Sequence, residues 1–210
     1  MEILREIGAV PVTKSALIPL LNNYKSPKDK ISALIKNGDI IPLKNGLYIS
    51  AEKYRDERIS LELLANQIYG PSYISLDSAL SFYGIIPEKV NSISSICVKR
   101  SRFFENSIGK FQYYHAKPEY FKIGIANHIT ENRKSFLIAS LEKALCDKIV
   151  YSRNLNIISF KAITTYLEED LRADFSAIEK IDYQIIEQCI KYEVKTWELE
   201  LLMKFLKRII

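Results

Sequence analysis

Short apolar stripes at helical spacing alternate with polar turns through the first fifty residues. The first stripe covers residues 13–21, where Thr13 is placed to cap a helix and Pro19 should kink or shorten it. A second helix should begin at Ser26, which precedes a proline suited to the first helical position, and end at Gly38. Its buried side is predicted to consist of Ile31, Leu34 and Ile35.

The opposite side of this second helix is polar around one small residue. At about 100° per residue, it centres on Asp29, Ala33 and Lys36, with Ser32 and Asn37 beside them. In a helix that reads DNA, an alanine can touch a thymine methyl group, while serine, lysine and asparagine reach base edges or phosphates. A solvated helix face without a ligand is the alternative interpretation.

A β-hairpin is predicted next, from apolar stretches at 40–43 and 47–50 joined by Lys44, Asn45 and Gly46. Asn-Gly favours the positive φ angles of a tight hairpin turn. Two helices, a turn and a hairpin in this order predict a winged helix-turn-helix. Its second helix would enter the major groove of double-stranded DNA, and its hairpin tip would lie over the adjacent backbone or minor groove. A winged helix that docks a protein is the alternative.

These elements give a set of candidate DNA-binding residues. They are Lys14, Ser26, Lys28, Asp29, Ser32, Ala33, Lys36, Asn37, Lys44 and Asn45. The positions chosen for substitution, Ala33, Lys36 and Lys44, are expected to face solvent. Changes there should therefore weaken DNA binding without altering the fold.

Beyond residue 50 the chain predicts a larger α+β domain. The charged stretch 51–57 is the expected boundary between a winged helix-turn-helix at 1–55 and an α+β domain at 56–210. A small sheet flanked by helices, followed by a helical C-terminus, is the predicted architecture of this second domain. The predicted strands are 92–98, 109–114, 121–125 and 135–137. The predicted helices are 58–69, one closed by Gly84, 139–151, 159–168 and amphipathic stretches up to Ile210.

Composition limits the class of protein. The chain has 210 residues, 48% of them hydrophobic, and no run approaches about 18 apolar residues, so no transmembrane helix is predicted. The first residues lack the basic segment and long apolar stretch of a signal peptide, and we expect a cytoplasmic protein. Three well-separated cysteines predict buried thiols rather than a disulfide framework or a zinc site, and no cofactor is expected.

The net charge of +5 is unevenly distributed. Residues 1–55 hold nine basic and five acidic side chains, residues 99–134 hold eight and three, and residues 167–200 hold four and ten. Basic patches favour a polyanionic partner through long-range attraction and release of counterions. In the basic middle, Lys99, Arg100 and Arg102 follow a predicted strand, where they either extend a surface toward nucleic acid or form a solvated loop.

Three segments carry a resemblance to a known family. The stretch 73–87, YISLDSALSFYGIIP, resembles the YVSLxSALxxYGLIP segment of the AbiEi-type antitoxins. ASLEKALCD at 139–147 resembles their later ASPEKALLD, and LKNGLY at 43–48 resembles their LxRGxY. Leu141 stands where the family usually has proline, and Asn45 stands where arginine is common. The second departure removes one expected DNA contact from the wing.

The resemblance implies a two-part transcriptional regulator of an abortive-infection system, which confers phage resistance. The winged helix would act as a repressor of its own operon. The C-terminal domain would counteract a nucleotidyltransferase-like toxin encoded alongside. The family is classed as type IV among toxin–antitoxin systems, meaning that no stable complex between toxin and antitoxin is required.

The helix that carries the later motif is a candidate for antitoxin function. Periodicity places Glu142, Lys143 and Asp147 on the polar face of an amphipathic helix, where Lys143 and Asp147 are four residues apart and able to pair. The resemblance implies an antitoxin role for these three residues. A salt-bridged packing helix is the alternative.

Other functions and sites find less support in the residues. An enzyme such as a nucleotidyltransferase would need carboxylates for Mg²⁺ and a phosphate cradle. The chain has no glycine-rich phosphate loop and no Asp-x-Asp pair in a strand, so no catalytic residues are expected. Residues 168–170 with Asp174 predict solvated carboxylates rather than a metal site. A regulator unrelated to any toxin is a further alternative.

The last third of the chain contains an apolar stripe that is expected to be core rather than an oligomer interface. It consists of Ile186, Ile190, Trp197, Leu201, Phe205 and Ile209. The oligomeric state does not follow from the sequence, because neither a heptad repeat nor a self-complementary face is visible.

Overall fold

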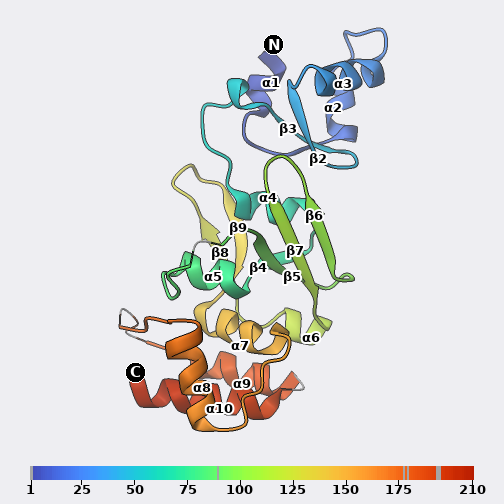
Figure 1. Ribbon diagram of the computed structural model, residues 1–210. Helices are drawn as coiled ribbons and strands as arrows, with labels where there is room; N and C mark the ends of the chain where they lie inside the picture. The colour runs from blue at the N-terminus through green and yellow to red at the C-terminus, as the bar shows by residue number, and fades with distance from the viewer. Residues whose placement is uncertain (1, 89, 177, 179, 193–194) are drawn as a thin grey trace.

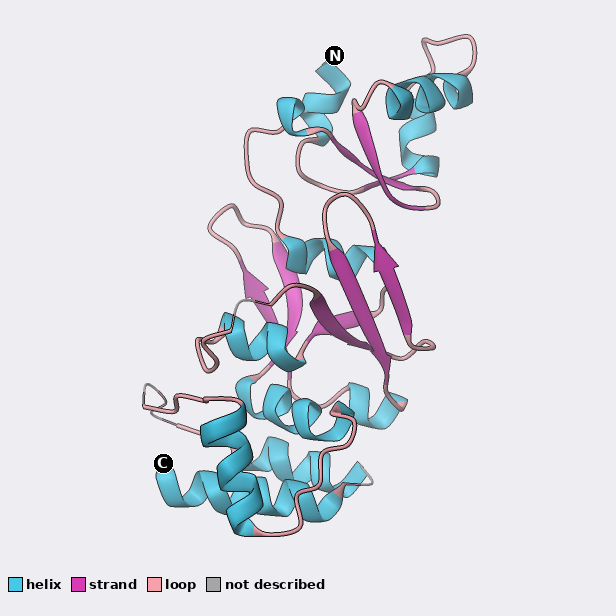
Figure 2. Cartoon of the chain, in the orientation of Figure 1, coloured by secondary structure: helices cyan, strands magenta, loops and turns pink. Residues whose placement is uncertain are grey.

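The computed structural model describes residues 2–88, 90–176, 178, 180–192 and 195–210, and the chain has a mixed α+β fold, as predicted. Its elements lie in three tiers: an N-terminal tier of helices and a small sheet, a central sheet, and a helical tier that ends the chain (Figure 1). The described strands belong to the first two tiers, and the third is helical, which confirms the predicted helical C-terminus (Figure 2).

The N-terminal tier combines three described helices with a three-stranded sheet. Its elements are α1 (Glu2–Ile7), β1 (Val12–Thr13), α2 (Lys14–Leu20), α3 (Pro27–Lys36), β2 (Ile40–Lys44) and β3 (Leu47–Ser50). The strands are antiparallel and lie in the order β1-β3-β2. A small apolar core of its own holds the tier together, formed by Leu4, Leu17, Leu21, Ile31, Leu34, Ile40 and Tyr48.

Local sequence signals explain where α2 and α3 begin. The hydroxyl oxygens of Thr13 and Ser26 each accept a hydrogen bond from the amide three residues later, at 3.2 and 3.5 Å. Pro19 lies in the last turn of α2, so this helix is short. On α3, Ile31 and Leu34 are buried. The predicted caps and the two central positions of the predicted apolar side are therefore confirmed.

A carboxylate ties the start of the hairpin to the segment that follows it. Oδ1 of Asp39 accepts hydrogen bonds from the Lys53 ammonium group at 2.6 Å and from the Tyr54 hydroxyl at 2.8 Å, both on the 3₁₀ turn η1 (Glu52–Tyr54). These hydrogen bonds, that of Lys53 first, hold the pKa of Asp39 below its usual value.

Asp39→Asn should destabilise the protein at neutral pH but not in acid. A carboxyl group with a depressed folded pKa stabilises the fold above its unfolded pKa, about 3.9, and loses this contribution as the pH falls through the folded value. In urea unfolding, we expect the wild-type midpoint to exceed that of Asp39→Asn at about pH 7, with a difference that shrinks between about pH 5 and pH 3. A difference that stays constant over this range would contradict the ionic role.

The central sheet is mixed, with some neighbouring strands parallel and others antiparallel. Its described strands, in spatial order, are β6 (Arg102–Glu105), β7 (Lys110–His115), β5 (Ile93–Cys97), β4 (Ser72–Ile74), β9 (Ser135–Ala139) and β8 (Ile125–Ile129). β5 is parallel to β7 and β4 to β9, whereas the other neighbours are antiparallel. Helices α4 (Leu61–Ile68) and α5 (Leu76–Phe82) pack against its middle strands.

For this sheet, one predicted strand is wrong and one observed strand was not predicted. Residues 121–125 are not a strand, because helix α6 (Pro118–Phe121) and a turn precede β8, which begins only at Ile125. Gly124 in this turn has a φ of +58°, and a Cβ added there would lie 2.8 Å from the Cβ of Lys143. Strand β6 has no counterpart in the prediction. It is an edge strand with mostly exposed side chains, so it lacks an apolar alternation.

The helical tier covers one end of the central sheet. Its elements are α7 (Leu141–Tyr151), α8 (Phe160–Thr165), the π-helical turn η2 (Tyr166–Asp170), α9 (Tyr183–Tyr192) and α10 (Thr196–Ile209). The three cysteines are buried free thiols, as predicted. No described helix has the length and apolar character needed to cross a membrane.

The apolar stripe predicted near the C-terminus is divided between α9 and α10. Ile186, Leu201 and Phe205 are buried, which confirms their place in the core. Trp197 and Ile209 are 51% and 43% exposed, so the prediction that they are core residues is wrong. The four α10 members of the stripe are each four residues apart, and the two exposed ones lie in the first and last turns of the helix, beyond the buried central positions Leu201 and Phe205.

Candidate nucleic-acid interface

Helix α3 lies in the N-terminal tier, away from the central sheet (Figure 1), and the residues of its outer face are exposed. The candidate residues on or next to this helix are exposed above the buried Ile31 and Leu34. They are Lys28, Asp29, Ser32, Ala33, Lys36 and Asn37. Ser26 is half-buried as the helix cap, and the Ser32 hydroxyl donates to the backbone oxygen of Lys28 at 3.2 Å. The structure thus brings most of the predicted DNA-binding residues onto one face.

Several exposed lysines of the N-terminal tier carry a charge that no described carboxylate neutralises. Lys14, at the start of α2, and Lys28 and Lys36, on α3, take part in none of the salt bridges among the described residues. An exposed ammonium group without a partner can bind a phosphate oxygen. Ala33 between the two α3 lysines leaves room for close approach to a groove, and the Asp29 carboxylate can accept a hydrogen bond from a cytosine amino group.

The hairpin β2–β3 joins the N-terminal tier to the central sheet. Tyr48 contributes to the N-terminal core, whereas Leu43, Leu47 and Ile49 are buried in the larger core of the molecule. The side-chain amide of Asn106, in the turn between β6 and β7, donates to the backbone oxygen of Leu43 at 3.0 Å. The hairpin is therefore packed on both sides rather than projecting as a free arm.

This packing changes the position expected for Lys44. Its ammonium group donates to the backbone oxygen of Ile68, at the end of α4, at 2.5 Å, and the residue is half-buried. The expectation that Lys44 faces open solvent is therefore wrong. Burial first, and then repulsion from Lys99 and Arg102, lowers the pKa of Lys44. Asn45 is exposed at the turn.

The second predicted basic surface lies directly beside this contact between the hairpin and the end of α4. Lys99, Arg100 and Arg102 are exposed. The Lys99 ammonium group donates to the backbone oxygen of Gly70 at 2.5 Å and lies 5.3 Å from the centre of the Tyr69 ring. The Arg102 guanidinium lies 6.0 Å from the same ring. Lys44 and Lys99 are far apart in the sequence, so no local pattern could have shown that they are neighbours.

The three candidate residues of α7 are buried. The predicted pair of Lys143 and Asp147 forms, with 2.8 Å between Nζ and Oδ1 and no exposure of either side chain. The carboxylate of Glu142 accepts a hydrogen bond from the amide of Asp182 at 2.9 Å. The polar face of α7 is covered because this helix packs against both α5 and α9, which agrees with the alternative of a salt-bridged packing helix. An antitoxin role for this helix stays a prediction, and it would act through packing rather than through exposed side chains.

The two longer sequence motifs meet in this buried network. Oδ2 of Asp147 accepts hydrogen bonds from the Ser75 hydroxyl at 2.6 Å and from the Tyr73 hydroxyl at 3.1 Å. Burial first, and then the charge of Asp147, raises the pKa of Tyr73 well above its usual value, so that its phenol stays protonated and donates. The Lys143 ammonium group also lies 3.0 Å from the centre of the Tyr120 ring. These contacts join β4 to α7.

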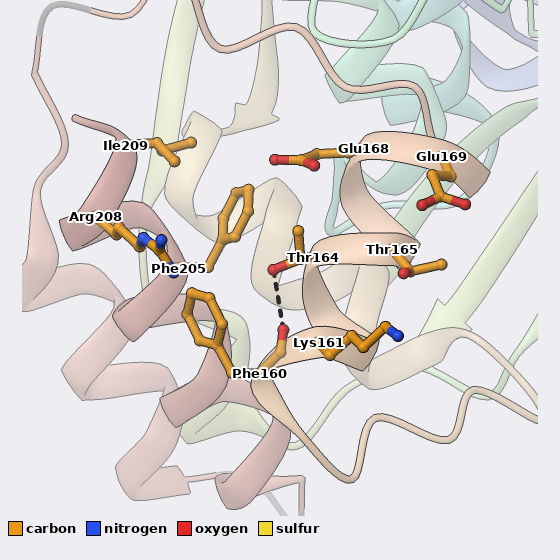
Figure 3. Close-up of a pocket in the computed structure, with 9 residues that line it drawn as sticks. All are labelled: Phe160, Lys161, Thr164, Thr165, Glu168, Glu169, Phe205, Arg208 and Ile209. Atoms are coloured by element: carbon orange, nitrogen blue, oxygen red, sulfur yellow. Dashed lines mark hydrogen bonds between the residues drawn. The ribbon is translucent and has the colours of Figure 1, made fainter.

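A cavity of about 510 Å³ lies between α8, η2 and the end of α10 (Figure 3). Figure 3 shows the rings of Phe160 and Phe205 near Arg208, with the two glutamates of η2 on the other side. The guanidinium of Arg208 lies 5.5 Å from the centre of the Phe160 ring. The cavity belongs to the helical tier, so it lies outside the candidate interface. Within the described parts of the chain, no three His, Cys, Asp or Glu residues are grouped to hold a metal ion.

Comparison with known proteins identifies no family for this chain. The sequence matches no protein-family model. A search among curated proteins likewise gives no match.

Proposed function

We propose that the N-terminal tier is a winged helix-turn-helix and that the protein is a sequence-specific DNA-binding regulator that acts in the cytoplasm. The element order α1-β1-α2-α3-β2-β3 and the strand order β1-β3-β2 support this fold. The observation that carries the proposal is the outer face of α3, where Ala33 is exposed together with Lys28 and Lys36. Such a helix suits the major groove, with its small residue toward the bases and its lysines toward phosphates.

In this proposal, residues 1–55 form the DNA-binding domain and residues 56–210 form the second, α+β domain. The small N-terminal core supports the division. The apolar side chains that the hairpin shares with the larger core fix the first domain on the second. DNA bound by α3 would therefore have a defined orientation relative to the central sheet.

Fluorescence anisotropy with the DNA immediately upstream of the gene tests the proposal. The measurement uses a scrambled duplex beside the upstream duplex, at two salt concentrations. Tight binding that the scrambled duplex does not match is the expected result. Equal, salt-sensitive binding to both duplexes would show that the protein binds DNA through a basic surface without sequence preference. The absence of binding at low salt would favour a winged helix that docks a protein.

Lys36→Ala should weaken binding to the upstream and scrambled duplexes by similar factors. Removing one phosphate contact should reduce the slope of log K against log salt concentration by about 0.9. Lys161→Ala is the matched control, because Lys161 is an exposed lysine of the helical tier. An unchanged slope for Lys36→Ala would exclude this lysine from the DNA contact.

We also propose that the protein represses its own operon and acts as the antitoxin against a nucleotidyltransferase-like toxin encoded alongside, without a stable complex. The support for this second part is the resemblance of three segments to AbiEi-type antitoxins. The contacts of Tyr73 and Ser75 with Asp147 favour a role of the longer motifs in the fold itself. A toxin-directed function would then belong to the exposed surface of residues 56–210.

Co-expression with the neighbouring gene separates the antitoxin from a regulator unrelated to any toxin. If the neighbouring gene product arrests growth, co-expression of this protein should restore it. Growth that is not restored, by a protein that still binds the upstream duplex, would overturn the antitoxin role and keep the regulator. The two experiments together therefore give separate answers for the two parts of the proposal.

A further inference from the structure

Three cations from two separate segments meet around one turn of the chain. The turn is Ile68-Tyr69-Gly70, between α4 and β4, and the cations are Lys44 at the end of β2 and Lys99 and Arg102 around the start of β6. Lys44 donates to the backbone oxygen of Ile68 and Lys99 to that of Gly70, both at 2.5 Å. Lys99 and Arg102 both lie over the ring of Tyr69. We call these three side chains the joint cations.

The charge of the joint cations is not balanced within the described structure. None of the three takes part in a salt bridge between described residues, and neutral backbone oxygens fix two of them without neutralising them. Elsewhere on the same β6–β7 hairpin, Lys110 is paired with Glu105. Like charges held together at a partly desolvated site repel one another, and a bound anion would relieve this repulsion.

The segments that carry the joint cations lie on the same side of the molecule as helix α3 (Figure 1). In Figure 1, α3, the tip of the β2–β3 hairpin and β6 follow one another along one edge of the structure. The hydrogen bonds from Lys44 to Ile68 and from Asn106 to Leu43 hold the hairpin tip and β6 in this arrangement. A duplex whose groove holds α3 could therefore continue along this edge.

We propose that the joint cations bind backbone phosphates of the same duplex that α3 reads, so that the DNA contact extends from the N-terminal tier onto the central sheet. This inference rests on the proposed function. Phosphate is the ligand that fits, because the cluster offers ammonium and guanidinium donors fixed in position but few groups that would read a base edge. The contact would add affinity and fix orientation without adding sequence preference.

Lys99→Ala combined with Arg102→Ala tests the inference on duplexes of two lengths. Both residues are exposed, so the double variant should keep the fold, which its thermal melting curve verifies. The short duplex covers the α3 site alone, and the long duplexes add about one helical turn, about 10 base pairs, on either flank. Each long duplex is extended on one flank only. On the one whose added turn reaches the joint cations, the double variant should bind about tenfold more weakly than wild type, with the salt slope reduced by about 1.8. On the short duplex the two proteins should bind alike.

Lys161→Ala combined with Lys180→Ala is the charge-matched control, since both are exposed lysines of the third tier, and it should behave as wild type on every duplex. Equal binding of the Lys99/Arg102 variant and wild type to all duplexes, with Lys36→Ala still weakened, would overturn the joint contact and leave the proposed function standing. Failure of wild type to prefer the upstream duplex would overturn the proposed function and this inference with it.

Discussion

Ala33→Glu should abolish specific binding to the upstream duplex. Ala33 lies at the centre of the exposed face of α3, where a glutamate adds both bulk and a negative charge against the phosphate backbone. Unfavourable juxtaposition of like charges in an interface costs several kcal/mol, which corresponds to a loss of about a hundredfold or more in affinity. Of the substitutions on the DNA-binding face, this one should have the largest effect.

The fold should survive this substitution, because Ala33 is exposed and glutamate is a good helix former. The matched control is Gln188→Glu, which adds the same charge at an exposed position of α9 in the helical tier. Anisotropy titrations of the two variants, with circular dichroism to compare their folds, give the answer. If Ala33→Glu binds like Gln188→Glu, then α3 does not enter the groove, and the proposed interface must be abandoned.

The sequence predicts α2 and α3 well because their signals are local, whereas α1 (Glu2–Ile7) was not predicted. Thr13 and Ser26 cap the next turn of chain, and Gly38 follows α3 with a φ of +68°. The exposed polar face of α3 follows from the same short-range pattern, since helical periodicity alone separates Ala33 from Leu34. The segment 13–38 contains all of these signals.

Where burial depends on a second segment, the sequence misleads. The spacing of Lys143 and Asp147 predicts their ion pair, but nothing within α7 shows that other helices bury the whole polar face. The hydroxyl groups that satisfy Asp147 come from Tyr73 of β4 and from Ser75 just after it, both in the other long motif. Only the fold shows that one motif supplies the hydrogen-bond donors for the buried carboxylate of the other.

The exposure of Lys44 is wrongly predicted for the same reason, because its burial depends on a second segment. Hairpin tips are usually exposed, and a lysine beside Asn-Gly therefore predicts a solvated side chain. The end of α4 lies against this tip and supplies the backbone oxygen of Ile68. The contact between hairpin and sheet depends on tertiary packing, so a hydrophobic pattern along the chain could not reveal the neighbourhood of Lys44, Lys99 and Arg102.

Asp147→Asn should be among the most destabilising substitutions in the chain. Asparagine keeps a neutral acceptor for Ser75 and Tyr73, but it leaves the Lys143 ammonium group fully buried without its counter-charge. Breaking a buried ion pair in this way costs about 3–5 kcal/mol. For a domain of this size, the melting temperature should fall by about 6–20 °C. Urea and thermal unfolding of the purified protein measure the change.

The double substitution of Lys143→Met with Asp147→Asn should recover much of this loss. Methionine fills a similar volume without a charge, and replacement of a buried ion pair by uncharged side chains of similar size is often close to neutral. Lys143→Met alone leaves the carboxylate of Asp147 with its two hydroxyl donors, so it should cost less than Asp147→Asn. If the double variant is as unstable as Asp147→Asn, then the lost charge balance is not the cause of the instability.

The same pair of variants decides what the motif of α7 does for the antitoxin. If the motif acts through the fold, growth rescue against the neighbouring gene product should fail with Asp147→Asn and return with the stable double variant. If rescue stays lost in a double variant that is folded and binds the upstream duplex, then Lys143 and Asp147 act in antitoxicity directly. That result would require α7 to open, because neither side chain is exposed in the folded protein.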